Sequence, residues 1–378
     1  MAVSHIVEKS DRSRSGRLMS LDVFRGLTIV FMIIVNTPGT WAHVFAPLRH
    51  SPWHGCTPTD LVFPSFLFIS GVAMWYSLRK YNFEFSGSSL MRILRRVILI
   101  FAVGLFLTIF PHFVRDYSTL RIMGVLQRIA LAWGFGAIIV MLLRRRYIWL
   151  ATAVLLLGYW ALMYFFGGSD PYSLENNLAR KVDLAVLGEN HVYKDKGYGV
   201  PFDPEGLLST IPAIGTVLIG FMTGSLINRL GKTWKTVGWL AVTGILLIGA
   251  GLIWNKFFPI NKPIWTSSYV LYAGGIAMII LALMFMIVDI WNLKGWTGFF
   301  NTFGTNALFT YALAGIWTRI MLNVKIGDST LYNWIFNHLR SPLFTEQKIA
   351  SLMFAILQVV LIWAIGYILY RKKIVIKL

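Results

Sequence analysis

Ten apolar stretches recur along this chain, and each approaches the roughly 20 residues that a helix needs to cross a bilayer. Charged residues make up only 13% of the sequence, whereas soluble domains hold about 25%. The pattern predicts an all-α integral membrane protein, a polytopic bundle of about ten transmembrane helices. The predicted spans are 21–39, 59–78, 91–111, 120–143, 147–166, 207–227, 236–254, 267–290, 298–320 and 349–370.

The basic residues indicate the orientation of the bundle. Lysine and arginine outnumber aspartate and glutamate by 35 to 16, which gives a net charge of +19. In so apolar a chain this surplus indicates cytoplasmic loops rather than a nucleic-acid partner. Alternating spans concentrate the surplus on one face when both the N- and C-termini are cytoplasmic. We therefore expect a basic cytoplasmic tail over 1–18, a single transmembrane domain over 19–371 with an outer loop over 167–206, and a cytoplasmic tail over 372–378.

Four polar side chains lie close together in the sequence on the predicted outer side of the membrane. Asn36 lies towards the end of the first span, His50 and His54 lie in the loop that follows, and Asp60 begins the second span. Because one short loop joins these residues, they can converge at one membrane face. Asp60 has an alternative role as a cap of the second helix.

Arg128 is the most unusual charge, because it lies about 12 Å along the fourth span at 1.5 Å per residue. Such a residue must face the bundle interior or a wet cavity. A structural partner such as Asp22 or Asp60 and an anionic ligand are equal alternatives for it. Asp22 and Arg25 are three residues apart on one helical face, so these two are expected to pair.

Other polar residues have a structural and a functional alternative. Asn301 and Asn306, in the ninth span, are suited to hydrogen bonds between helices. Asp203, followed by Pro204, resembles an N-cap before the sixth span, while Asp203 and Glu205 are equally suited to contact a substrate. A Walker A loop, a zinc-binding His-Glu-x-x-His and a Gly-x-Ser-x-Gly elbow do not occur in the sequence, and no ligand spacing supports a metal site.

A set of motifs, in order along the chain, resembles the heparan-alpha-glucosaminide N-acetyltransferase family and its bacterial relatives. The resemblance covers nearly the whole chain, and it is to the shorter bacterial form, which lacks the extra lumenal region of the animal members. The motifs are Ser20-Leu21-Asp22-Val23-Phe24-Arg25-Gly26-Leu27, Val35-Asn36, His50-Ser51-Pro52-Trp53-His54-Gly55, Thr59-Asp60-Leu61-Val62-Phe63-Pro64, Gly124-Val125-Leu126-Gln127-Arg128, Phe202-Asp203-Pro204-Glu205-Gly206 and Phe303-Gly304-Thr305-Asn306-Ala307-Leu308.

The resemblance implies a transmembrane acyltransferase that moves acetyl from acetyl-CoA to the amine of glucosamine or of a terminal glucosaminide. It implies catalytic roles for His50, Asn36 and Asp60, whereas His54 matches the family pattern less well. Histidine titrates near neutral pH, so His50 is expected to act as general base or to accept the acetyl group transiently. Asp60 would orient the imidazole, and Asn36 would donate a hydrogen bond to the developing oxyanion.

The resemblance also implies ligands and partners. The co-substrate acetyl-CoA carries phosphates that need cations or hydrogen-bond donors, and no metal is expected. The expected partners are an amino-sugar acceptor and the lipid bilayer, and a homodimer is left open. The implied location is the bacterial inner membrane, with the active-site loop on the periplasmic side. The alternative function is an amino-sugar transporter, because some bacterial relatives have been labelled as transporters related to N-acetylglucosamine.

The expected cofactor-binding residues are Arg128, Gln127, Arg121 and Asn306, and the expected substrate-binding residues are Trp53, Asp203 and Glu205.

Overall fold

The computed structural model describes residues 18–111, 113, 117–194 and 197–376. Apart from a hairpin of β1 (Lys325–Ile326) and β2 (Ser329–Thr330), the regular structure within these ranges is helical. A π-helical turn, Phe285–Ile290, extends one of the helices, α10. The α-helices are α2 (Met19–Asn36), α3 (Val62–Arg79), α4 (Gly87–Ile109), α5 (Val125–Leu142), α6 (Ile148–Phe166), α7 (Leu178–Leu187), α8 (Thr210–Leu230), α9 (Trp234–Trp254), α10 (Ser267–Met284), α11 (Thr297–Thr305), α12 (Ala307–Asn323), α13 (Leu331–Leu343) and α14 (Gln347–Arg371).

Eight helical segments of the described residues are long and apolar enough to cross a membrane. They correspond to eight of the ten predicted spans and confirm the all-α polytopic bundle. The segments are Met19–Asn36, Pro58–Arg79, Val125–Leu142, Arg145–Phe166, Thr210–Leu230, Trp234–Trp254, Ser267–Ile290 and Gln347–Arg371.

The other two predicted spans are less regular. α4 is 23 residues long, but it carries Arg92, Arg95 and Arg96 in its first half, so its apolar stretch is shorter. The predicted span 298–320 is wrong as a single helix, because the chain breaks at Asn306, which has φ −120° and ψ 44°.

The break at Asn306 is stabilised by the C-terminal tail. The Asn306 side-chain amide donates a hydrogen bond to the Ile374 carbonyl and accepts one from the Ile376 N–H, both at 2.9 Å. These side-chain bonds bring 374–376 against the junction of α11 and α12. The predicted interhelical role of Asn306 is therefore replaced by a contact with the tail.

α8 lies at the centre of the bundle. About 78% of its apolar span is buried, whereas α6 and α9 bury 28% and 22% of theirs. α3 crosses α8 closely, since a Cβ at Gly71 would lie 2.0 Å from the Val217 carbonyl oxygen. Likewise, a Cβ at Gly220 would lie 2.1 Å from the Phe68 carbonyl oxygen. Small residues permit this close approach of backbones, and the outward apolar faces of α6 and α9 suit contact with lipid.

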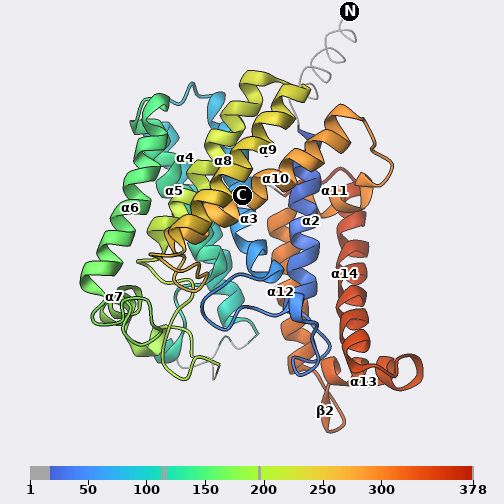
Figure 1. Ribbon diagram of the computed structural model, residues 1–378. Coiled ribbons are helices and arrows are strands. Elements are labelled where there is room, and N and C mark those ends of the chain that lie inside the picture. Colours follow the sequence, from blue (N-terminus) through green and yellow to red (C-terminus); the bar gives the residue numbers. More distant parts are fainter. Residues whose placement is uncertain (1–17, 112, 114–116, 195–196, 377–378) are drawn as a thin grey trace, which may run out of the picture.

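The loops that carry most of the predicted site residues gather at one end of the bundle (Figure 1). The loop 37–57, the segments 167–194 and 197–206 with α7, and the β1–β2 hairpin with α13 all lie at this end. The N-terminal end of α2 lies at the opposite end. This arrangement agrees with the predicted alternation of spans, and which end faces the cytoplasm stays a prediction. The predicted tail 1–18 lies almost wholly outside the described residues.

Candidate active site

Asp60 is buried where the short 3-10 helix Pro58–Leu61 leads into α3, and only 1% of the residue is exposed. One carboxylate oxygen accepts hydrogen bonds from the backbone N–H groups of Ser51 and Thr57 and from the Thr57 hydroxyl, each at 3.0 Å. Thr57 and Asp60 form a capping box. The predicted capping role is thus confirmed, from the third position of the helical turn.

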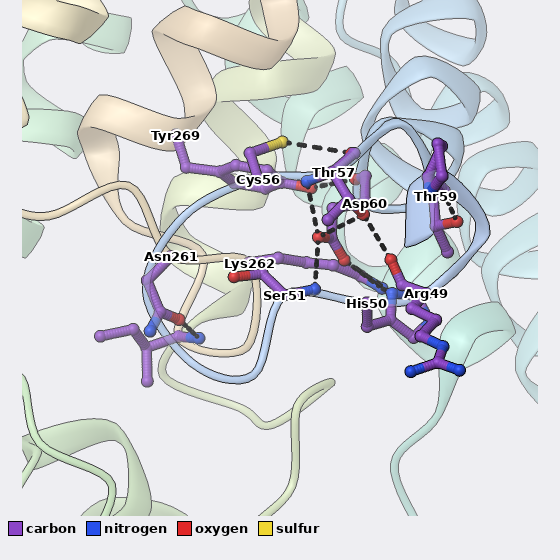
Figure 2. Close-up of polar contacts among 12 residues, drawn as sticks. Arg49, His50, Ser51, Cys56, Thr57, Thr59, Asp60, Asn261, Lys262 and Tyr269 are labelled. Atoms are coloured by element: carbon purple, nitrogen blue, oxygen red, sulfur yellow. Dashed lines mark hydrogen bonds and ion pairs between the residues drawn. The ribbon is translucent and has the colours of Figure 1, made fainter. Parts of the chain in front are cut away.

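The second Asp60 oxygen holds His50 (Figure 2). His50 Nδ1 lies 2.6 Å from this oxygen. An ionised carboxylate can only accept, so Nδ1 carries the proton and Nε2 is left as the basic nitrogen. About 47% of the His50 side chain is exposed, against 2% for Asp60. The pair therefore combines an accessible base with a buried aspartate that fixes its tautomer and orientation.

Lys262 completes this cluster, although no local sequence pattern indicates it. It lies in the turn between α9 and α10, with Nζ 3.1 Å from His50 Nδ1 and 3.5 Å from an Asp60 carboxylate oxygen (Figure 2). Burial lowers the pKa of Lys262, and the neighbouring carboxylates of Asp60 and Glu205 oppose that effect. Lys256, in the same turn, is exposed, and the local sequence does not distinguish the two lysines.

Asn36 shares a cavity with His50. This cavity, of about 150 Å³, is also lined by Glu205, Lys262 and Tyr311. A second cavity, of about 280 Å³, adjoins it and shares Asn36 and Tyr311 in its wall. The fold therefore brings the three predicted catalytic residues to one site, with Asp60 behind His50 and Asn36 at the junction of two cavities.

Arg121 connects the outer segment to this site. Its guanidinium donates hydrogen bonds of 2.9 and 2.6 Å to Asp203 and one of 2.5 Å to Glu205. The N-cap alternative for Asp203 is wrong, because α8 begins only at Thr210 and the Asp203 carboxylate binds Arg121 instead. Burial alone would raise the pKa of Glu205, but the charges of Arg121 and Arg128 outweigh it and hold the pKa below its ordinary value.

Arg128 is fully buried, as its depth in the span predicts. Its Nη2 donates to the Gly206 carbonyl at 3.1 Å and to the Ser209 hydroxyl. The guanidinium also lies 5.1 Å from the centroid of the Trp265 ring. Arg128 thus ties α5 to the turn before α8, and these partners replace the two carboxylates that the sequence suggested.

Trp53 and His54 pack against residues of the other outer loops. The Trp53 indole donates a hydrogen bond to the Tyr172 carbonyl at 2.8 Å and packs edge-on against Phe202, with ring centroids 5.4 Å apart. His54 Nδ1 lies 3.3 Å from the Asn261 side-chain nitrogen. Burial lowers the pKa of His54, and the charge of Asp170 opposes that effect. Of these two histidines, only His50 contacts the Asp60 side chain. This agrees with the weaker family match of His54.

The residues predicted to bind the cofactor lie in three places. Arg121 and Gln127 line the 280 Å³ cavity, and Arg128 is enclosed by protein. Asn306 lines a third cavity, of about 630 Å³. That cavity shares Phe66 and Ile129 in its wall with the His50 cavity.

Arg25 and Arg96 also line this third cavity. Arg25 pairs with Asp22 at 3.0 Å, as the sequence predicts, and also donates to the Gly304 carbonyl. Arg96 stacks against Trp133, with its guanidinium carbon 4.2 Å from the ring centroid. Within the described residues there is no group of three or more His, Cys, Asp or Glu side chains that could hold a metal ion.

Comparison with known proteins identifies the family of this chain. Residues 17–252 match the family described as "Heparan-alpha-glucosaminide N-acetyltransferase, catalytic". The chain is 26% identical to the human heparan-alpha-glucosaminide N-acetyltransferase, over 95% of this chain and 59% of that protein. It is also 26% identical to the mouse protein of the same name, over 96% of this chain and 61% of that protein. The chain thus spans about three fifths of the length of these curated relatives. The match covers more than half of the chain, so this protein belongs to the heparan-alpha-glucosaminide N-acetyltransferase catalytic family.

Proposed function

We propose that this protein transfers the acetyl group of acetyl-CoA to the amine of glucosamine or of a terminal glucosaminide. The observation that carries the proposal is the His50–Asp60 pair in a chain of this family. Asp60 accepts the Nδ1 hydrogen bond at 2.6 Å, so the basic Nε2 of an accessible imidazole is available next to the 150 Å³ cavity. That is the group an amine acetylation requires, since the attacking amine must lose a proton.

The proposed reaction is a direct transfer. His50 Nε2 takes a proton from the acceptor amine as the nitrogen forms a bond to the thioester carbonyl carbon. Asn36 donates a hydrogen bond to the oxyanion of the tetrahedral intermediate. The carbon–sulfur bond then breaks, and the leaving thiolate of CoA recovers the proton from the His50 imidazolium. Asp60 stabilises that imidazolium while it exists.

Lys262 balances the charge of the cluster. Its ammonium lies 3.1 Å from His50 Nδ1, on the side of the imidazole that faces Asp60. Its 3.5 Å ion pair favours the ionised form of Asp60. The ionised Asp60 then keeps the His50 imidazole correctly oriented before the amine arrives.

We propose the 630 Å³ cavity as the binding place of the acetyl-CoA molecule. The cavity is the largest of those described, it is lined by Arg25 and Arg96, and it adjoins the His50 cavity at Phe66 and Ile129. Arginine is well suited to phosphate oxygens. Arg121 is less suited to that role, because Asp203 and Glu205 already neutralise it.

The activity is tested with the purified protein in detergent. Acetyl-CoA and a panel of amino sugars are supplied, and free CoA is followed with a thiol reagent. Release of CoA that depends on the amino sugar supports the transferase, because catalysis needs no sealed compartment. Release of one equivalent without an acceptor would indicate an acetyl-His50 intermediate instead. No release over the whole panel would favour the amino-sugar transporter.

The orientation of the site is part of the proposal. The positive-inside bias places the loop that carries His50 on the periplasmic side of a bacterial inner membrane. Reporter fusions at Ser173 and at Arg145 are expected to report opposite sides, with Ser173 outside. The same side for both reporters would contradict the proposed topology.

A further inference from the structure

Arg319, in α12, is a charge for which the proposed reaction has no use. Its Nη1 donates to the Gly315 carbonyl of its own helix at 3.0 Å, and this is the only hydrogen bond of its guanidinium within the described part of the chain. Two other cations of the site have carboxylate partners, since Arg121 pairs with Asp203 and Glu205 and Lys262 pairs with Asp60. The buried Arg128 donates instead to Gly206 and Ser209. Arg319 lies four residues before the end of α12, is half-buried and lines the 280 Å³ cavity.

The 280 Å³ cavity that Arg319 lines has a second hydrogen-bond donor in Gln127. Gln127 lines it too, is 2% exposed, and has no partner for its amide nitrogen among the described residues. A Cβ at Gly104 would lie 2.4 Å from the Gln127 side-chain oxygen, so this glycine makes the space that the amide occupies. Thr108 and Thr318 also line the cavity, but their hydroxyl groups already donate to the carbonyls of Gly104 and Ala314. The cavity is therefore suited to a ligand that supplies acceptor oxygens, and its arginine favours an anion.

We infer that this cavity binds an anionic group of the acceptor, a carboxylate or phosphate that lies beside the reactive amino sugar, and that Arg319 binds that group. The inference rests on the proposed function and names its substrate class. Asn36 lies in the wall shared with the His50 cavity, so one acceptor can place its amine at His50 and its anion at Arg319.

The position of the cavity favours the acceptor over acetyl-CoA. The amine must approach the thioester carbonyl carbon from a direction that acetyl-CoA does not occupy. The 630 Å³ cavity adjoins the His50 cavity at Phe66 and Ile129, and the 280 Å³ cavity adjoins it at Asn36 and Tyr311. The two substrates therefore have separate approaches, and Arg319 lies on the second.

The kinetic test compares neutral and anionic acceptors. Glucosamine is the neutral acceptor, glucosamine 6-phosphate is the phosphate acceptor, and a glucosaminyl-glucuronate disaccharide is the carboxylate acceptor. For whichever anionic acceptor the wild type prefers, Arg319→Gln is expected to lower kcat/KM by about 10- to 100-fold, since a charge-assisted hydrogen bond is lost. Glucosamine turnover and the KM for acetyl-CoA are expected to stay within about twofold, and Arg319→Lys is expected to recover part of the loss.

The matched control is Lys256→Gln, which removes an exposed cation from the same end of the bundle and is expected to leave the preference unchanged. A second readout needs no turnover: the acetylated anionic sugar is expected to raise the melting temperature of the wild type but not of Arg319→Gln. This separates the two proposals, because the shift survives if the enzyme is inactive in detergent. A raised KM for acetyl-CoA in Arg319→Gln, or a wild type that neither prefers nor binds either anion, overturns the inference.

Discussion

Asp60→Asn tests the proposed catalytic geometry at its most constrained point. One Asp60 oxygen accepts three hydrogen bonds, from Ser51 and Thr57, and the other accepts the His50 bond. An asparagine has one oxygen and one NH₂ group, so it can satisfy only one side. Keeping its oxygen toward the three donors preserves the loop and turns the NH₂ group toward His50.

This turn of the amide reverses the histidine tautomer. His50 Nδ1 must then accept a hydrogen bond, the proton moves to Nε2, and Nε2 can no longer take a proton from the amine. A wrong tautomer of this kind costs about 10⁴-fold in kcat in a catalytic triad. We therefore expect Asp60→Asn to lower the rate of acetyl transfer by about 10³- to 10⁴-fold. Lys262 also loses the anion that lies 3.5 Å away, so a lower melting temperature is expected.

The assay is CoA release with acetyl-CoA and the preferred amino sugar, at matched amounts of detergent-purified protein with unchanged helical circular dichroism. Asp170→Asn is the matched control, because it makes the same charge change at an exposed position of the outer segment. It is expected to retain activity within about twofold. If Asp60→Asn is folded and within about tenfold of the wild type, Asp60 does not set the tautomer and the reasoning fails.

Three further predictions concern single residues. His50→Ala is expected to lower the rate by about 10²- to 10⁴-fold in the same assay, while His54→Ala stays near normal; the reverse result would show that the wrong histidine was assigned. Asn36→Ala is expected to lower kcat by about 10²- to 10³-fold with a smaller change in KM, and a change in KM alone would contradict the oxyanion role. Burial raises the pKa of Asp183, in α7, to about 7, so the folded protein binds this proton more tightly than the unfolded chain. Melting temperature is therefore expected to fall as pH rises from about 4 to about 7, and Asp183→Asn is expected to flatten that slope; an unchanged slope would exclude Asp183 as its cause.

The helices that the sequence predicted best are those whose signal is local. A run of about 20 apolar residues must become a helix in a bilayer, whatever surrounds it, because its backbone groups need partners. The break at Asn306 was missed for the opposite reason. It depends on the Ile374 and Ile376 backbone, about 70 residues away, and the local sequence there reads as one continuous apolar helix.

The two short helices α7 and α13 were also missed. They lie outside the apolar runs, and their buried residues depend on what packs above them. Tyr332 and Phe336 of α13, for example, are buried in a cluster with Phe354 of α14. An amphipathic segment of 10 or 13 residues is too short to signal a helix without that partner.

Local sequence is enough to predict the membrane bundle and the meeting of His50 with Asp60, because the two residues are ten positions apart around one loop and the aspartate caps the helix that follows. The tertiary structure alone decided the other charges of the site. Lys262 reaches His50 across 212 residues, through the contact of Gly55 with Asn261, and Arg121 reaches Asp203 across 82. Such pairings depend on which helices pack side by side, and that is decided by the shapes of whole helix faces rather than by any local pattern.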